Sequence, residues 1–152
     1  SGRVGLLGWS KGGEMARLGA SLMGAAGPFG CVAAHAPTGL VTGAFYPAAF
    51  RAEPRLPVDP GGARAWVWAG RDGRLAPGAP IPIEECAVPV FLSIGTADPI
   101  VDPARTLALA DRLAAAGRPA DLLVAEGQGH GYDFDTEPVL WSRLMAFFGR
   151  HL

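Results

Sequence analysis

Gly8-Trp9-Ser10-Lys11-Gly12 decides the fold, because it joins an apolar run to a helical pattern. Before it, Arg3-Val4-Gly5-Leu6-Leu7 is typical of a buried parallel strand. After it, apolar residues recur at helical spacing (Met15, Leu18 and Leu22) until Gly24, Gly27 and Pro28 end the pattern. Small residues two positions either side of Ser10 let strand and helix approach closely. The stretch predicts a sharp, strained turn that lifts Ser10 above the end of the strand.

Beyond this turn, strands and helices alternate. Apolar runs at residues 31–34, 89–94 and 121–125 predict strands. One helix should begin at Pro103 with Asp102 as its N-cap and end at Gly117; another should span roughly 137–150. Their inner faces are predicted as Leu107, Ala110, Leu113 and Ala114, and as Leu140, Trp141, Leu144, Met145 and Phe148. The alternation implies βαβ units, a parallel sheet and the α/β fold class.

Residues 36–88 differ from the rest, because they are rich in proline and glycine. They contain one strand-like stretch at 65–68, followed by a turn at 70–73. We interpret them as an irregular excursion above the sheet, a small lid or hairpin, within a single domain that spans residues 1–152.

Composition excludes several classes of protein. Of 152 residues, 49% are apolar and 18% charged, and the net charge of −1 gives no basic field for nucleic acid. No apolar run reaches the ~18–20 residues that span a bilayer, and Ser1-Gly2-Arg3 is not a signal peptide, so we expect a cytoplasmic location. Cys31 and Cys86 lack metal-ligand spacing; buried thiols are favoured, with a single disulfide as the alternative.

Ser10 would need a base to act as a nucleophile, and the chain has three histidines. His130 lies in the loop Gly127-Gln128-Gly129-His130-Gly131 after the last predicted strand, although an ordinary loop histidine is the alternative. His151 is penultimate, where it would interact with a helix dipole. His35 ends the second strand and precedes any candidate acid. We therefore choose His130.

Asp98 is the preferred acid, because it follows the strand at 90–94 and should lie beside the His130 loop. Asp102 is better used as an N-cap, and Asp133 and Asp135 should face solvent or cap the final helix. The order Ser10, Asp98, His130 is that of α/β-hydrolases. The Lys11 backbone N–H would supply one oxyanion donor, Trp9 and His35 are candidate pocket residues, and no metal or cofactor is expected.

The chain also resembles a family. Gly-x-Ser-Lys-Gly-Gly-Glu-Met-Ala at 8–16 resembles the elbow of the acyl-CoA thioesterase and bile-acid-CoA:amino acid N-acyltransferase C-terminal domain. The likeness continues through Ile81-Pro82-Ile83-Glu84-Glu85, Pro89-Val90-Phe91-Leu92, the Asp98 loop and Gly127-Gln128-Gly129-His130. It implies a serine hydrolase that cleaves acyl-CoA thioesters, since the amidating members carry cysteine in place of Ser10. Glu14 has an ordinary alternative, as an acid in a helix's first turn.

In that family a β-sandwich and several further strands precede the elbow, together with the loop that gives the second oxyanion donor. We therefore expect only the C-terminal half of an α/β-hydrolase fold, from a longer protein or a truncated reading frame, with an exposed sheet edge that favours self-association. The enzyme alternatives are a carboxylesterase or dienelactone-hydrolase-like enzyme and an acylaminoacyl-peptidase-like enzyme. A different class is an inactive fragment or partner domain.

Overall fold

A four-stranded parallel sheet forms the centre of the molecule in the computed structural model, which describes residues 4–42, 66 and 75–152. The strands are β1 (Val4–Trp9), β2 (Phe29–His35), β3 (Val90–Gly95) and β4 (Asp121–Ala125), and they lie side by side in chain order. Every neighbouring pair is parallel. The predicted α/β class and all four predicted strands are confirmed.

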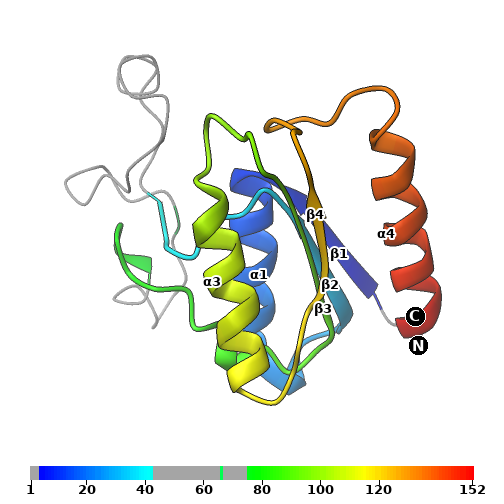
Figure 1. The fold of residues 1–152 in the computed structure, drawn as a ribbon. Helices are drawn as coiled ribbons and strands as arrows, with labels where there is room; N and C mark the ends of the chain where they lie inside the picture. Colours follow the sequence, from blue (N-terminus) through cyan, green and yellow to red (C-terminus); the bar gives the residue numbers. More distant parts are fainter. Residues whose placement is uncertain (1–3, 43–65, 67–74) are drawn as a thin grey trace.

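Helices cover both faces of this sheet (Figure 1). On one face lie α1 (Lys11–Met23), α3 (Pro103–Ala115) and the 3₁₀ helix η3 (Ile83–Glu85), and on the other lies α4 (Glu137–His151). Along β2, Val32 and Ala34 belong to the core under α1 and α3, whereas Cys31 and Ala33 pack with α4. Both sides of this strand are therefore buried, which explains its unbroken apolar run.

Each helix buries only part of the stripe that its apolar residues predict: Leu18 and Leu22 of α1, Leu113 of α3, and Leu140 and Leu144 of α4 are buried. Met15 is 53% exposed, Leu107 37% and Met145 64%; Ala114 and Trp141 are also exposed. In α3 the buried residues are Thr106, Leu109 and Leu113, and in α4 they are Leu140, Leu144 and Phe147. The Thr106 hydroxyl donates a 2.8 Å hydrogen bond to the Pro37 carbonyl, so a polar residue can occupy a core position.

The described ends of the 36–88 excursion contribute to the core, and the predicted lid or hairpin above the sheet stays a prediction. Ile81, Ile83 and Cys86 are fully buried, and Leu40 forms an antiparallel bridge with Pro80. Ile81 packs with Leu18 and Leu22 of α1. The predicted stretch at 65–68, apart from Trp66, and the turn at 70–73 lie outside the described residues.

Cys31 and Cys86 are both free and buried, which confirms the favoured interpretation over a disulfide. In the described part of the chain, no helix combines the length and the apolar character that crossing a bilayer requires.

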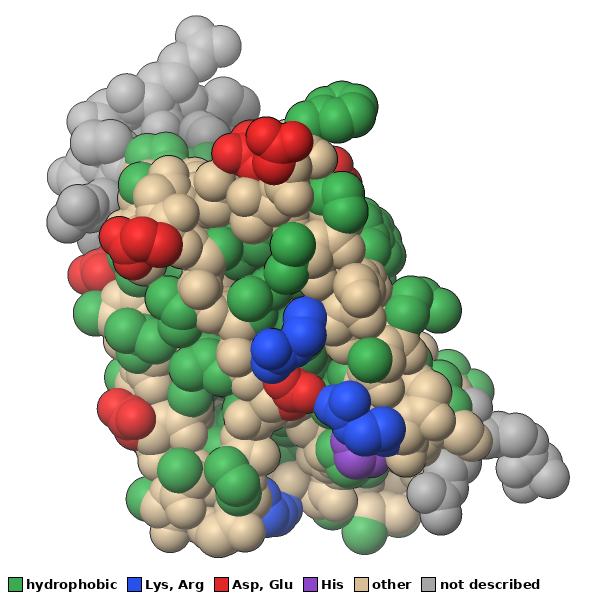
Figure 2. Space-filling view, turned by 45° about the vertical axis from the view of Figure 1, so that its right-hand side comes forward, with side chains coloured by type: hydrophobic (Ala, Val, Ile, Leu, Met, Phe, Trp, Pro, Cys, Tyr) green, Lys and Arg blue, Asp and Glu red, His purple; other side chains and the backbone are tan. Residues whose placement is uncertain are grey.

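The surface carries exposed apolar residues on the edge strand and an arginine cluster beside α4. Val4 and Leu7 of β1 are 49% and 45% exposed. On the α4 side, Arg143 and Arg150 each bind one oxygen of Asp121 at 2.6 Å; Figure 2 shows basic side chains around an acidic one on this side. The predicted self-association through the edge stays a prediction.

Gly95, the last residue of β3, provides a test of this packing. A Cβ at Gly95 would lie 2.2 Å from the Gln128 carbonyl oxygen, whereas one at Gly131 would meet nothing within 4 Å. Gly95→Ala should therefore lower the free energy of unfolding by about 1–3 kcal/mol. Gly131→Ala should change it by less than about 0.5 kcal/mol. Denaturant titration measures both, and equal midpoints would contradict the close approach.

Candidate active site

Ser10 lies at the junction of β1 and α1 with a backbone strained as predicted. Its φ of 53° and ψ of −117° lie where residues other than glycine are rarely found. Gly8 is essential to the turn, since a Cβ there would lie 2.1 Å from the Gly12 carbonyl oxygen. Gly12 itself would carry a Cβ in open space; Gly13 is the second close contact, 3.1 Å from the Gly8 oxygen. The predicted pair of small residues is thus corrected to Gly8 and Gly13.

Asp98 and His130 meet as the sequence predicts, because β3 and β4 are adjacent and parallel. His130 Nδ1 lies 2.8 Å from Asp98 Oδ2, and since a carboxylate only accepts, Nδ1 carries the proton. Asp98 Oδ1 accepts from the backbone N–H groups of Ile100 at 2.8 Å and Val101 at 2.9 Å. In the neutral ring with this single proton, the lone pair lies on His130 Nε2.

Asp98 is 2% exposed, and its environment still favours the charged form. Burial opposes ionisation, but hydrogen bonds from His130, Val101 and Ile100 together outweigh it and hold the pKa of Asp98 below its usual value. The loop is fixed by the bond from the Ala97 N–H to the Gln128 carbonyl, 2.9 Å long. The structure thus supplies an oriented, charged acid beside an imidazole.

Ser10 Oγ makes no hydrogen bond to the His130 ring in the described part of the chain, so their approach stays a prediction. In free enzymes the hydrogen bonds of catalysis are often long and tighten with substrate. Ser10 is instead tied to the strand beside it, because its backbone N–H donates to the His35 carbonyl at 2.8 Å. The Lys11 backbone N–H as an oxyanion donor also stays a prediction.

The two candidate pocket residues behave differently. Trp9 is 39% exposed and its ring packs on His35, with 3.9 Å between the ring centroids. His35 is 1% exposed, so it lies behind the site and does not line an open pocket. Among the described residues, no three histidine, cysteine or acidic side chains are grouped as a metal site.

Asp102 and Asp133 have the alternative roles that the sequence predicts, whereas the helix-dipole role of His151 stays a prediction. Asp102 Oδ1 caps α3 by accepting from the Ala104 N–H at 3.0 Å. Asp133 Oδ1 accepts from the Thr136 N–H at 2.8 Å at the start of α4. His151 lies in the last turn of α4 with its ring against Phe147.

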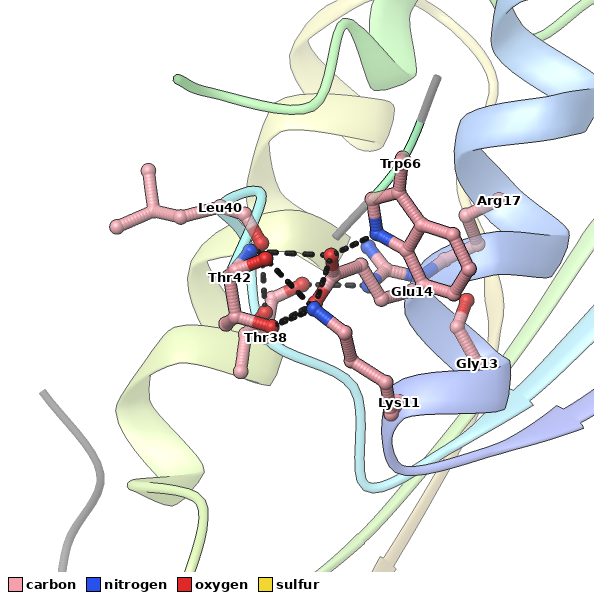
Figure 3. A network of polar contacts seen from close by, with 8 residues as sticks. All are labelled: Lys11, Gly13, Glu14, Arg17, Thr38, Leu40, Thr42 and Trp66. Carbon is pink, nitrogen blue, oxygen red and sulfur yellow. Dashed lines mark hydrogen bonds and ion pairs between the residues drawn. The ribbon is translucent and has the colours of Figure 1, made fainter. Parts of the chain in front are cut away.

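Sequence reasoning missed a buried polar network that begins one residue after Ser10 (Figure 3). Glu14 is 1% exposed, which corrects its interpretation as an ordinary first-turn acid. Its Oε1 accepts from Lys11 Nζ at 3.0 Å, the Thr42 N–H at 3.0 Å and Trp66 Nε1 at 2.6 Å, and its Oε2 accepts from the Thr42 hydroxyl. Glu14 therefore fastens residues 42 and 66 to the first turn of α1.

Arg17, one turn further along α1, is fully buried beside this network. It donates to the Gly13 carbonyl at 3.2 Å and to the Thr38 carbonyl at 2.5 Å, and burial lowers the pKa of its guanidinium to about 9. The spacing of Lys11, Glu14 and Arg17 on the same helix face as Leu18 is the sequence signal that could have indicated these contacts.

Comparisons with known proteins agree with this geometry. The model of the prolyl oligopeptidase family, peptidase S9, matches residues 1–152. The fold is similar to dipeptidyl peptidase 4 of Porphyromonas gingivalis (TM-score 0.70, 20% identity, 97% of this chain and 19% of that one). It is also similar to a puromycin-hydrolyzing peptidase of Mycobacterium tuberculosis (TM-score 0.69, 20% identity, 99% of this chain and 22% of that one). A third similar structure is esterase Pf2001 of Pyrococcus furiosus (TM-score 0.62, 22% identity, 99% of this chain and 55% of that one).

At these identities the likeness shows the fold, which is that of α/β-hydrolases. The chain spans about a fifth of the length of the two peptidases. A comparison with curated protein sequences gave no match. The acyl-CoA thioesterase family that the sequence resembles is not the one whose model matches.

The Glu14 network should contribute to stability. Glu14→Gln places an NH₂ group where one oxygen now accepts, so one buried donor loses its acceptor, and the free energy of unfolding should fall by about 1–3 kcal/mol. The exposed Glu126→Gln should change it by less than about 0.5 kcal/mol. Denaturant titration of both variants checks this, and equal effects would show that the network contributes nothing.

Asp98 should make stability depend on pH in the acid range. Since its folded-state pKa is lowered, its contribution is complete above the unfolded-state value of about 3.9 and is lost as pH falls through the folded-state pKa. Asn does not titrate, so the stability difference between wild type and Asp98→Asn should shrink as pH falls below about 4. Unfolding at several pH values measures it, and a constant difference would be the contrary result.

Proposed function

The chain belongs to the prolyl oligopeptidase family, and from this premise we propose that it is a serine hydrolase that cleaves acyl bonds through an intermediate on Ser10. The observation that carries the proposal is the 2.8 Å hydrogen bond between Asp98 and His130 at the end of the sheet where Ser10 forms its strained turn. We assign Ser10 as nucleophile, His130 as base and Asp98 as orienting acid.

The proposed reaction follows from these groups. Ser10 Oγ attacks the substrate carbonyl while His130 Nε2 takes its proton, and Asp98 stabilises the imidazolium that forms. The Lys11 backbone N–H donates to the developing oxyanion. His130 then protonates the leaving group, the bond between this group and the former carbonyl carbon breaks, and the acyl-Ser10 ester remains. A water molecule, deprotonated by His130, hydrolyses this ester and restores the Ser10 hydroxyl.

We propose a peptide or similar amide bond as the first substrate class. The family is named after an oligopeptidase, and the first two similar structures named above are peptidases. An amide nitrogen leaves poorly unless it is protonated, and an imidazolium held by a buried carboxylate can supply that proton. Carboxylic esters are the closest alternative, supported by the similar esterase.

Acyl-CoA thioesters are the third candidate, supported by the residues that resemble the thioesterase family. In this structure those residues make contacts that hold the fold together. Glu14 binds Thr42 and Trp66, and Glu84 forms a bidentate pair with Arg112 at 2.5 and 2.7 Å. Ile81 and Ile83 are buried in the core. The resemblance therefore follows packing more closely than substrate chemistry, and we rank thioesters after amides and oxygen esters.

Labelling with a fluorophosphonate probe tests the nucleophile. Wild-type protein should be labelled, and Ser10→Ala should lose labelling while its melting temperature changes little, because Ser10 is only partly buried. The matched control Ser142→Ala removes an exposed hydroxyl on α4 and should label like wild type. Absence of labelling in folded wild-type protein would instead favour an inactive fragment or partner domain.

Substrates with one acyl group and three leaving groups separate the substrate classes. We expect turnover of an acyl p-nitroanilide and of the matching p-nitrophenyl ester, both abolished by Ser10→Ala. Cleavage of the CoA thioester with no detectable amide hydrolysis would exclude the peptide proposal and favour a thioesterase. Cleavage of the oxygen ester alone would favour an esterase.

A further inference from the structure

His35 is buried beneath the site and forms hydrogen bonds with both Ser10 and His130. Its backbone carbonyl accepts the Ser10 N–H at 2.8 Å, while its side-chain Nε2 lies 2.9 Å from the His130 carbonyl oxygen. Its other ring nitrogen, Nδ1, lies 2.9 Å from Ser93 Oγ on β3. The contacts of one residue thus extend across three neighbouring strand ends.

We propose that His35 is a positioning residue that holds the His130 loop at a fixed place relative to the Ser10 turn. The proposal rests on the function proposed above. It concerns a residue outside the triad, and it gives the catalytic base a second attachment that is independent of Asp98.

The hydrogen-bond partners fix the state of the His35 ring. The His130 carbonyl can only accept, so His35 Nε2 must carry the proton. Nδ1 is then an acceptor, and the Ser93 hydroxyl donates to it. Because a hydroxyl can rotate to donate or accept, Ser93 accommodates the tautomer that the His130 carbonyl selects. The ring is therefore a neutral donor aimed at the base loop.

The surroundings keep the ring neutral and inaccessible. Burial lowers the pKa of His35, and the titratable groups that face it are His130, Asp98 and Tyr132. Its ring lies between Trp9 at 3.9 Å and Tyr132 at 4.7 Å, measured between centroids. With 1% of its surface exposed, His35 cannot touch a substrate. It acts through His130, and proton exchange with substrate belongs to His130 alone.

Two substitutions separate positioning from packing. His35→Phe keeps a ring of similar size but removes the donor to the His130 carbonyl. His35→Gln loses the ring, yet its amide N–H can reach the same carbonyl. We expect His35→Phe to lower the rate constant of fluorophosphonate labelling by about 10²-fold, the scale of a small displacement of a catalytic group. His35→Gln should recover most of that rate.

Ser93→Ala provides an alternative test if the His35→Phe variant does not fold. It keeps the ring but removes the hydroxyl that donates to Nδ1, and should slow labelling roughly tenfold, the value of one ordinary hydrogen bond. His151→Gln, at the far end of α4, should label like wild type. Melting temperatures are measured for every variant.

The proposal would be overturned if the labelling rate constants simply followed the melting temperatures of the variants. It would also be overturned if His35→Gln were labelled no faster than His35→Phe, or if Ser93→Ala were labelled at the wild-type rate. Proton NMR of the Asp98–His130 hydrogen bond provides a second measurement that does not require activity. Its downfield Nδ1–H signal should be sharp in wild type, broadened or lost in His35→Phe and restored in His35→Gln. Unlabelled wild type with this NMR pattern would refute the proposed function and leave the positioning role standing. An unchanged signal in all variants would refute the positioning role.

Discussion

Parallel pairing places Trp9, His35 and Ser93 opposite one another on β1, β2 and β3, and the arrangement of the site depends on this row. The ladder continues one residue past three strand ends. Ser10 N–H bonds to the His35 carbonyl at 2.8 Å, Ala36 N–H to the Ser93 carbonyl at 2.7 Å, and Thr96 N–H to the Ala125 carbonyl at 3.0 Å. Each loop therefore leaves the sheet at a fixed point. Candidate site residues that are distant in sequence lie on loops that begin at neighbouring strand ends.

The same ladder supports the local strain that the site needs. Ser10 and Ala36 both have positive φ values, 53° and 47°, directly after their strands. Such backbone costs about 1–3 kcal/mol per residue and persists only where its surroundings over-determine it. Here the surroundings are the hydrogen bonds of the ladder, the close approach at Gly8 and the Glu14 network over the first turn of α1.

Sequence reasoning could predict the strands and the pairing of Asp98 with His130, because apolar runs and chain order determine which loops are neighbours. It predicted part of each buried helix face, as at Leu113, Leu140 and Leu144, but not the polar residues that are buried on α1. Counting apolar residues assumes that charged side chains face water, whereas Glu14 and Arg17 are buried by partners at residues 38, 42 and 66. Met15, which lies next to Glu14 in the sequence, is 53% exposed. The role of His35 was also missed, since its contact with the His130 carbonyl joins residues 95 positions apart.

The central claim is that this framework brings Ser10 within reach of His130, and a crystal structure of the protein reacted with a phosphonate measures it most directly. Phosphorus should be bonded to Ser10 Oγ, with His130 Nε2 within about 3.2 Å of Oγ or of the phosphonate oxygen. His130 should still donate from Nδ1 to Asp98. A modified Ser10 with the His130 ring turned to solvent, or modification at a different serine, would contradict the account.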